Sequence, residues 1–375
     1  MKNINRKKIL FLVNDDNFFI THRLPIAIQA KIEGFDIHIA GKKTNKSEIL
    51  KQNGFKFYPL NFHRSSGNPI KLLNYIFNIF LIINKVRPTI VHAITIKPVI
   101  FGGIVLIFFS DINFVASISG LGYVFMVRNK FEAVRLEFVK LLYKLSLSKK
   151  NIKVIFQNKD DLNKISKFCN LRKNNHILIK GSGVDLDEFK YKKIPSGKPV
   201  VLFASRLLIS KGVLDFAKAS FFTKDVRFLI AGNIDKDNFD SLKEIDLKSL
   251  ESQGLIEYLG FKENIKELIY KSSIVILPSY YREGLPKILI EAAACGRPII
   301  TTNHPGCRDA IINNKSGILV PPKSPKSISK SIKKILKDFN SCEEMGKESR
   351  KMAEKFFDIK KVVFTHMQIY KGFID

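Results

Sequence analysis

The chain has 375 residues, a length that suggests two domains and allows two hydrophobic cores. Its four cysteines include no C-x-x-C pair, which argues against a zinc ribbon or a disulfide framework and fits a reducing cytosol. No segment reaches the roughly 18 consecutive apolar residues of a membrane-spanning helix. The apolar run 9–13 is short and is expected to be a strand rather than a signal peptide.

The net charge of +29 is unevenly distributed. Residues 1–193 hold 33 Lys and Arg against 13 Asp and Glu, whereas the remaining residues hold 30 against 21. A basic first half suits an anionic membrane surface or a lipid-diphosphate acceptor. Nucleic acid would be the competing partner, but Lys outnumbers Arg by 50 to 13 and neither an arginine-rich recognition helix nor RNP-type aromatics are present. No nucleic-acid partner is therefore expected.

The first half of the chain alternates between strand-like and helix-like patterns. Strands are predicted at 8–13, 35–40, 54–60, 89–93, 114–118 and 154–157. Helices are predicted at 24–33, 70–86, 98–110 and 129–148, the third of them buried in the protein. Residues 14–25 are predicted to form a polar loop after the first strand, without the G-x-G-x-x-G of a dinucleotide site. This alternation indicates a Rossmann-like domain.

A stretch of Lys, Pro, Ser and Gly at 190–198 is predicted to be an interdomain linker. Further strands are predicted at 199–204, 227–231, 256–259, 274–277, 299–302 and 317–320. Helices are predicted at 287–295, 326–338 and 343–357, with a last one near 359–371. We therefore predict an α/β fold with two Rossmann-like β/α/β domains, residues 1–190 and 198–358.

Residues 277–309 carry the most informative functional pattern. A loop follows the strand 274–277 and leads to a helix. Pro286 is suited to the first turn of this helix, and Gly296 is suited to its C-terminal end. Glu283 in the loop and Glu291 in the helix stand eight residues apart. The helix N-terminus attracts an anion, and the two carboxylates suit sugar hydroxyls. The spacing alone leaves open that Glu283 is a simple loop charge and Glu291 an exposed helix residue.

The segment EGLPKILIE at 283–291 resembles the E-x7-E motif of the retaining, nucleotide-sugar-dependent glycosyltransferases of family 4. Similar motifs recur along the chain at 14–25 (NDDNFFITHRLP), 96–98, 119–125 (SGLGYVF), 156–161, 181–189 and 205–212 (SRLLISKG). The surrounding residues look like the subgroup that adds N-acetylgalactosamine to a diphospho-undecaprenol-linked sugar. The resemblance implies the GT-B fold, in which two Rossmann-like domains face a central cleft and the last helix, here about 359–375, packs back on the first domain.

The resemblance also implies a donor site. Arg206 and Lys211 match the R-x4-K pair that binds the leaving diphosphate, and with Glu283 they are the predicted catalytic residues. The alternative is that Arg206 and Lys211 are simply two surface cations near a turn. Glu291 is predicted to bind the ribose hydroxyls. UDP-sugar is the expected co-substrate, and neither a cofactor nor a metal ion is expected because the cations take the role of the metal.

Backbone groups complete the predicted donor site. The segment Gly284, Leu285 and Pro286 is expected to hold the donor sugar and its phosphate, and Gly260 and Phe261 the base, with uracil implied by resemblance alone. Gly120 and Gly122 would bring the backbone of the first domain close to the donor sugar. Many relatives carry a histidine here; this chain has Ser119 and Gly120.

Acceptor binding is assigned to the first domain, at the ligand edge of its sheet. The predicted acceptor-binding residues are Asn14, Asp16, His22, Arg23 and Lys97. A core or capping role is the alternative for His22. His92 and His38 are predicted to be structural, and the segment 304–306 is predicted to face the cleft from the second domain.

The expected function is retaining transfer of a sugar, N-acetylhexosamine by resemblance, from a UDP-sugar to a lipid-linked undecaprenyl-diphosphate saccharide. The setting would be bacterial surface glycan synthesis, such as capsule or O-antigen. The enzyme would be cytoplasmic and peripherally associated with the inner face of the plasma membrane. Two alternatives remain open: a UDP-N-acetylhexosamine 2-epimerase-like enzyme, and a non-catalytic basic module that binds anionic lipid or nucleic acid.

Overall fold

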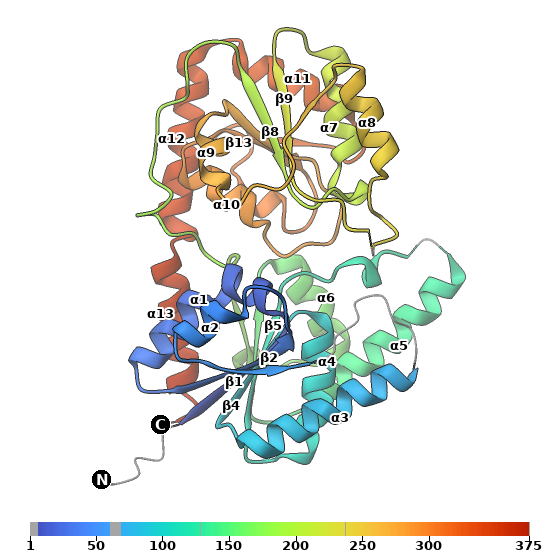
Figure 1. Ribbon diagram of the computed structural model, residues 1–375, viewed down its shortest axis with the longest axis vertical. Helices are drawn as coiled ribbons and strands as arrows, with labels where there is room; N and C mark the ends of the chain where they lie inside the picture. Colours follow the sequence, from blue (N-terminus) through green and yellow to red (C-terminus); the bar gives the residue numbers. More distant parts are fainter. Residues whose placement is uncertain (1–6, 61–68, 128, 237, 375) are drawn as a thin grey trace. The chain divides into compact units, whose positions relative to one another are not determined.

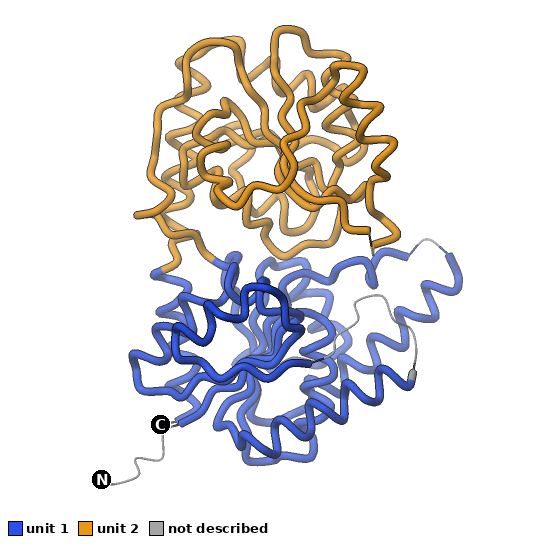
Figure 2. The backbone as a smooth tube through the Cα atoms, in the orientation of Figure 1, with its two compact units in different colours: residues 1–182, 360–375 blue, residues 183–359 orange. Residues whose placement is uncertain are grey.

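The computed structural model describes residues 7–60, 69–127, 129–236 and 238–374. The chain divides into two compact units (Figure 2): unit 1 comprises residues 1–182 and 360–375, and unit 2 comprises residues 183–359. The predicted linker 190–198 lies inside unit 2, where Ile194 is buried and the buried Arg297 donates a hydrogen bond to the Lys193 carbonyl at 3.2 Å. These contacts explain why the division falls before the linker.

Unit 1 is built on a parallel sheet with the strand order β3-β2-β1-β4-β5-β6-β7 in its described part. The strands are β1 (Lys8–Asp15), β2 (Asp36–Lys42), β3 (Lys56–Pro59), β4 (Ile90–Ile94), β5 (Asn113–Ile118), β6 (Ile152–Phe156) and β7 (His176–Leu178). The central strands are buried along most of their length and are mainly apolar, because helices cover both faces of the sheet.

The helices of unit 1 form two layers (Figure 1). One layer contains α1 (Asp16–Ile32), α2 (Ser47–Gln52) and α13 (Ile359–Lys371). The other contains α3 (Pro69–Val86), α4 (Ile96–Val105), α5 (Lys130–Ser146) and α6 (Lys159–Cys169). Short 3-10 turns are η1 (Leu106–Phe108), η2 (Tyr123–Phe125) and η3 (Lys173–Asn175). Helix α4 is buried, as predicted, but it ends at Val105. The predicted helix 98–110 is therefore too long, and Ile107 and Phe108 in η1 are exposed.

Helix α1 begins at Asp16, so the predicted polar loop 14–25 is wrong. Asp15 is extended (φ −155°) and accepts a hydrogen bond from the Phe18 amide at 2.7 Å, which caps the helix N-terminus. Pro25 lies inside the helix. A proline removes one helical donor, but the buried face of this helix, which includes Phe19 and Ile26, keeps it docked on the sheet.

Unit 2 repeats the plan with the strand order β10-β9-β8-β11-β12-β13, again all parallel. The strands are β8 (Val200–Ala204), β9 (Arg227–Ala231), β10 (Glu257–Tyr258), β11 (Ile274–Leu277), β12 (Ile299–Thr302) and β13 (Gly317–Val320). The helices are α7 (Val213–Ala219), α8 (Glu244–Ser252), α9 (Ile265–Tyr270), α10 (Lys287–Ala294), α11 (Pro325–Leu336) and α12 (Phe339–Phe356), with 3-10 turns η4 (Ile209–Lys211), η5 (Ser220–Phe222) and η6 (Arg308–Ala310). Both units are therefore Rossmann-like, which confirms the predicted α/β class.

Helix α10 differs from its prediction only at its ends. Pro286 is the N-cap (φ −62°, ψ 128°) rather than a first-turn residue, and Cys295 is the C-cap. Gly296 follows with φ +73°, and the Arg297 amide donates back to the Ala292 carbonyl at 2.9 Å, a common way to end a helix. Among the described helices of the chain, none has the length and apolar character needed to cross a bilayer.

Candidate active site

The strand order of unit 2 reverses between β8 and β11, which are neighbours in the sheet. Loops at the carboxyl ends of strands on either side of such a reversal form the usual ligand crevice of an open α/β sheet. The loop after β8 carries Arg206 and Lys211, and the loop after β11 carries Glu283. The topology therefore brings the three predicted catalytic residues to one edge of unit 2.

The two loops are fixed to each other by backbone contacts. The Ser210 carbonyl accepts hydrogen bonds from the amides of Tyr280 and Tyr281 at 2.8 and 3.1 Å. Gly212 has φ +81°, and a Cβ at this position would lie 2.4 Å from the Pro278 carbonyl oxygen. Only glycine fits this approach without displacing one of the loops.

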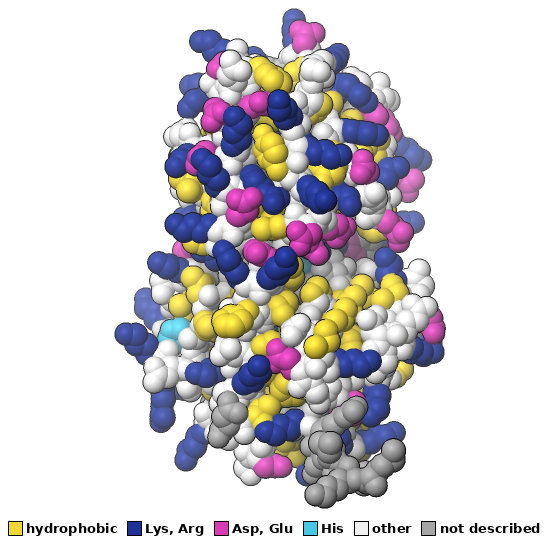
Figure 3. Space-filling model, turned by 90° about the vertical axis from the view of Figure 1, so that its left-hand side faces the viewer, with side chains coloured by type: hydrophobic (Ala, Val, Ile, Leu, Met, Phe, Trp, Pro, Cys, Tyr) yellow, Lys and Arg dark blue, Asp and Glu magenta, His cyan; other side chains and the backbone are white. Residues whose placement is uncertain are grey.

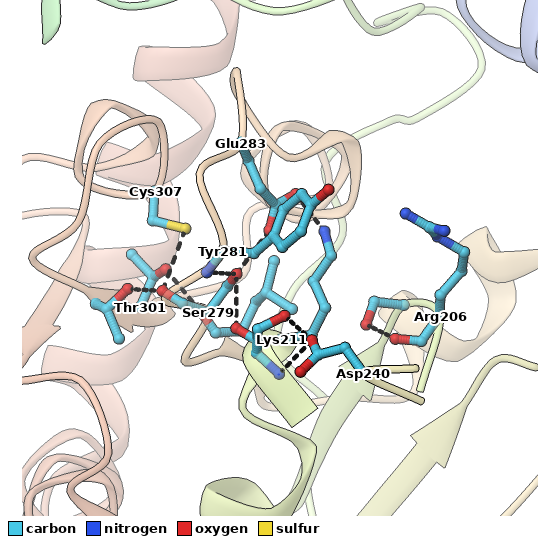
Figure 4. Close-up of polar contacts among 12 residues, drawn as sticks. Arg206, Lys211, Asp240, Ser279, Tyr281, Glu283, Thr301 and Cys307 are labelled. Atoms are coloured by element: carbon cyan, nitrogen blue, oxygen red, sulfur yellow. Dashed lines mark hydrogen bonds and ion pairs between the residues drawn. The ribbon is translucent and has the colours of Figure 1, made fainter. Parts of the chain in front are cut away.

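Lys211 and Glu283 form an ion pair, and each side chain is only 11% exposed. The Ser279 hydroxyl donates to the other Glu283 oxygen at 2.7 Å (Figure 4). Burial strengthens the attraction between the charges but makes either one costly to leave alone. The pair thus places a shielded ammonium group and an oriented carboxylate at the ligand edge.

Arg206 extends in the same direction as Lys211 in Figure 4. Its side chain is 44% exposed and pairs with Asp235 at 2.8 Å. The guanidinium group is therefore accessible as well as paired, and an anion that binds here competes with one carboxylate. The alternative interpretation placed both cations on the surface near a turn. It is wrong for Lys211, which is buried.

Glu291 is buried in α10, so the alternative of an exposed helix residue is wrong. Burial raises the pKa of its carboxyl group to about 7, and the ammonium of Lys287, 3.6 Å away, opposes that rise. Hydrogen bonds to the charged form of a buried carboxylate stabilise that form.

The loop 284–286 is also tightly held. Gly306, at φ +81°, packs so closely that a Cβ there would lie 1.7 Å from the Gly284 carbonyl oxygen. Gly284, Leu285 and Pro286 are all buried, and Pro286 has no N–H to donate. Beside this loop, burial and the positive charge of Arg282 lower the pKa of His304.

Gly260 and Phe261 lie next to the same edge through Gly232. The Gly232 amide donates to the Gly260 carbonyl at 2.9 Å, and a Cβ at Gly232 would lie 1.8 Å from the Ser205 carbonyl oxygen. Phe261 itself is exposed. The predicted base-binding segment is therefore adjacent to the loop that carries Arg206.

The sequence analysis missed the polar residues that fix these loops. Asp240 is buried and accepts hydrogen bonds from the Ser210 amide, at 3.1 Å, and from its hydroxyl group. Thr302 donates to the Ser279 carbonyl. Asp240 and Thr302 lie in other loops or strands than the motifs, and nothing in their local sequence marks them.

In unit 1 the sheet reverses between β1 and β4. Asn14, at the end of β1, accepts a hydrogen bond from the Thr95 hydroxyl at 3.0 Å. Thr95 precedes α4 with φ +75°, a strained value for a β-branched residue that is found most often at functional sites. Lys97 follows in the first turn of α4, half-buried, and burial lowers its pKa. Asn14 and Lys97 thus lie on the two segments that flank the reversal.

The other acceptor predictions fall on α1 rather than on a loop. Asp16 is fully buried and accepts from the Thr44 amide and hydroxyl at 2.8 and 2.5 Å, so it anchors a turn and offers no exposed surface to an acceptor. His22 lies 3.2 Å from the Ser182 hydroxyl.

Arg23 is buried and bonds to the His22 carbonyl at 2.8 Å and to the Ser119 hydroxyl at 3.4 Å; burial lowers its pKa to about 10. It therefore supports the turn that contains Gly120 (φ +102°) and Gly122 (φ +58°).

His92 is structural, as predicted. It is buried between the Tyr370 and Ser117 hydroxyls, at 2.6 and 2.7 Å, and so ties α13 to the sheet of unit 1. His38 is buried as well and lies 3.0 Å from both Tyr58 and Asp36. Among the described residues, no three His, Cys, Asp or Glu side chains are grouped so that they could hold a metal ion.

Comparison with known proteins identifies the family. A model of the glycosyl transferases group 1 matches residues 184–352, and a glycosyl transferase 4-like model matches residues 8–158. The chain is 28% identical over 334 residues to the N,N'-diacetylbacillosaminyl-diphospho-undecaprenol alpha-1,3-N-acetylgalactosaminyltransferase of Campylobacter jejuni. The aligned region covers 84% of this chain and 86% of that protein.

Solved structures agree with the fold. Sucrose-phosphate synthase from Thermosynechococcus elongatus aligns with a TM-score of 0.83 at 19% identity, over 98% of this chain and 99% of that one. Anabaena Alr3699/HepE, solved in complex with UDP, aligns with a TM-score of 0.77 at 17% identity, over 97% and 100%. The family models match both units, and the chain belongs to the group 1, family 4-like glycosyltransferases, which are hexosyltransferases with the GT-B fold.

Proposed function

We propose that this enzyme transfers a sugar, an N-acetylhexosamine, from a UDP-sugar to a lipid-linked undecaprenyl-diphosphate saccharide with retention of the anomeric configuration. The observation that carries the proposal is the clustering of Arg206, Lys211 and Glu283 at the strand-order reversal of unit 2. Two cations suit a diphosphate, and a carboxylate fixed by Ser279 suits sugar hydroxyls. The Campylobacter relative, whose name includes a diphospho-undecaprenol acceptor, supports the acceptor class.

The proposed reaction breaks the bond between the sugar C1 and the diphosphate oxygen and forms a bond from C1 to the acceptor hydroxyl oxygen on the same face. The acceptor proton passes to the departing diphosphate, so atoms and charges balance without a separate base. Arg206 and Lys211 stabilise the negative charge that develops on the leaving group, and we propose that they do so without a metal ion. Glu291 binds the ribose hydroxyls, and Glu283 orients the donor sugar.

The acceptor side of the proposal rests on unit 1. Asn14 and Lys97 flank the strand-order reversal of its sheet, and a lysine there suits an acceptor phosphate. On the face that Figure 3 draws, Lys and Arg side chains outnumber Asp and Glu over this unit. We propose that the enzyme works at the inner face of the plasma membrane, in bacterial surface glycan assembly such as capsule or O-antigen synthesis, and that nucleic acid is not its partner.

The test is a panel of UDP-sugars incubated with a pool of lipid-linked acceptors, with the products read by mass spectrometry. One UDP-sugar is expected to add one hexose or N-acetylhexosamine mass to an acceptor, and Glu283→Gln is expected to abolish the product. Glu257→Gln, which alters an exposed ion pair at β10, is the control and is expected to keep full activity. Conversion of a UDP-N-acetylhexosamine into its 2-epimer without an acceptor would instead identify an epimerase.

A further inference from the structure

Helix α5 carries an apolar stripe that faces away from the protein. Phe131, Val134, Phe138, Leu141 and Leu145 are all exposed and recur at intervals of three and four residues. The residues that pack inward, including Leu136 and Tyr143, lie on the opposite side of the helix, since each residue advances by about 100°. A stripe of large apolar side chains on a surface helix indicates an interaction face.

Helix α3 carries a matching stripe. Leu73, Phe77 and Leu81 are exposed, whereas Ile79 and Ile83 are buried toward the sheet. Both helices pack against the buried α4 in one layer (Figure 1). The packing of α5 on α4 is close, because a Cβ at Gly103 would lie 2.4 Å from the Ser146 carbonyl oxygen. The two stripes therefore point outward from the same layer of unit 1.

A third apolar segment joins them at η1, where Ile107 and Phe108 are exposed. Lys149, just beyond α5, donates to the Phe109 carbonyl at 2.6 Å, and the guanidinium of Arg87, just beyond α3, lies 5.6 Å from the Phe109 ring centroid. The ends of α3 and α5 are thus tied to η1 through two cations. We call the exposed apolar residues of α3, η1 and α5 the apolar face.

The charge around the apolar face selects its partner. Helix α3 contains Lys71 and Lys85 and no acidic residue. Helix α5 contains Lys130, Lys140 and Lys144, and Glu137 is its one exposed acid. Two copies of this face would bring lysines against lysines, whereas an anionic lipid surface has the complementary charge. Phenylalanine and leucine flanked by lysine are typical of helices that lie in a bilayer interface.

We propose that the apolar face is a monotopic membrane-docking surface: the outer sides of α3 and α5, with η1, insert into the interface of an anionic bilayer while their lysines contact the lipid headgroups. The inference rests on the proposed action on a lipid-linked acceptor, and it assigns the surface through which the enzyme reaches the membrane. Insertion is shallow, since both helices lie on the protein and none crosses the bilayer.

The experiment is flotation of the full chain with vesicles of phosphatidylcholine, with or without phosphatidylglycerol. The unmodified chain is expected to float with the anionic vesicles and less with the neutral ones. A double variant, Phe131→Ser with Phe138→Ser, is expected to lower vesicle binding by about tenfold or more, because it removes two large apolar groups from the interface. Both residues are exposed, at 79% and 59%, so the substitutions disturb no core.

Phe364→Ser on α13 is the matched control. Phe364 is 64% exposed but lies in the other helix layer of unit 1, so vesicle binding is expected to persist. The proposal is overturned if the unmodified chain fails to float, or if the double variant floats as well as the control. It is also overturned if sedimentation shows a dimer that the double variant dissociates, since the face would then bind a second copy. The vesicles contain no substrate, so flotation does not depend on the donor site. Calorimetric titration of the same proteins with UDP tests the donor site separately.

Discussion

Arg206 and Lys211 belong to one motif but have different surroundings. Lys211 is buried against Glu283, whereas Arg206 is almost half exposed and pairs with Asp235. Loss of a buried partner leaves a charge without compensation, whereas loss of an exposed partner costs little. Substitutions at Lys211 or Glu283 therefore combine folding and function, and Arg206 is the position at which diphosphate binding can be measured with the least disturbance of the fold.

Arg206→Ala is expected to weaken UDP binding by about 1.5–3 kcal/mol, the scale of a charge-assisted hydrogen bond. Calorimetric titration with UDP measures the change. Arg227→Ala is the matched control, because Arg227 is likewise half exposed and ion-paired, to Glu257 at 2.6 Å, but begins β9 rather than following β8. Equal UDP affinity in the two variants would remove Arg206 from the site.

Glu291 makes a pH-dependent contribution to stability. Its pKa in the folded chain is about 7, above the ordinary value of 4.5. Between these values the folded chain holds a proton that the unfolded chain has released, so stability falls as pH rises through this window. Glu291→Gln removes the titrating group. Above the window it is expected to be more stable than the unmodified chain by up to about 3 kcal/mol.

Urea unfolding of both proteins below and above this window measures the effect. Glu244→Gln on α8 is the control, since Glu244 is exposed and its removal is expected to leave the pH profile unchanged. If Glu291→Gln showed the same loss of stability with rising pH as the unmodified chain, the raised pKa would not be the cause.

At the scale of elements, the loops of unit 2 act as one assembly. Ser210 links the loop after β8 to the loop after β11, and Asp240 holds Ser210 from a third loop. Gly306 packs on Gly284 from the loop after β12. The positions of Arg206, Lys211 and Glu283 thus depend on backbone contacts between segments far apart in sequence, which keeps the charged groups oriented before a ligand arrives.

Gly212→Ala tests this assembly. The new Cβ would meet the Pro278 carbonyl oxygen at 2.4 Å, so the two loops must separate, and UDP affinity is expected to fall by about tenfold or more. Gly254→Ala is the control, because Gly254 also has a positive φ (+68°) but no atom lies within 4 Å of its Cβ. It is expected to lose only about 1–2 kcal/mol of stability, the cost of the backbone conformation, and to bind UDP normally. Unimpaired UDP binding by Gly212→Ala would contradict the coupling of the loops.

Most elements could be predicted from the sequence because their patterns are local. The strands 227–231, 274–277, 299–302 and 317–320 have the predicted bounds. Helix α1 starts at Asp16, eight residues before its predicted start at residue 24, because a polar loop was expected up to Pro25 and tertiary packing overrides the helix-breaking preference of proline. The edge strand β7 was not predicted; it has only three residues, His176–Leu178, and all of them are partly buried.

At the scale of the whole molecule, both units share the same order over six strands, with β7 as an added edge strand in unit 1, and each sheet has one reversal in its described part. Some of the predicted ligand residues lie there: Arg206, Lys211 and Glu283 in unit 2, Asn14 and Lys97 in unit 1. Parallel strands place all their carboxyl ends at one edge, so residues far apart in the chain meet without any local signal. Five lysines of the basic first half, Lys71, Lys85, Lys130, Lys140 and Lys144, lie on α3 and α5, the helices that carry most of the apolar face.

The sequence by itself determined the two Rossmann-like units, the motif residues and the glycosyltransferase family, because periodicity, turn residues and short motifs are local properties. Only the tertiary structure decided that Glu291 is buried, that Lys211 pairs with Glu283, that Asp16 anchors a turn, and that Asp240 holds the site together. Burial and pairing depend on which distant segments pack against a side chain, and the chain order does not specify that.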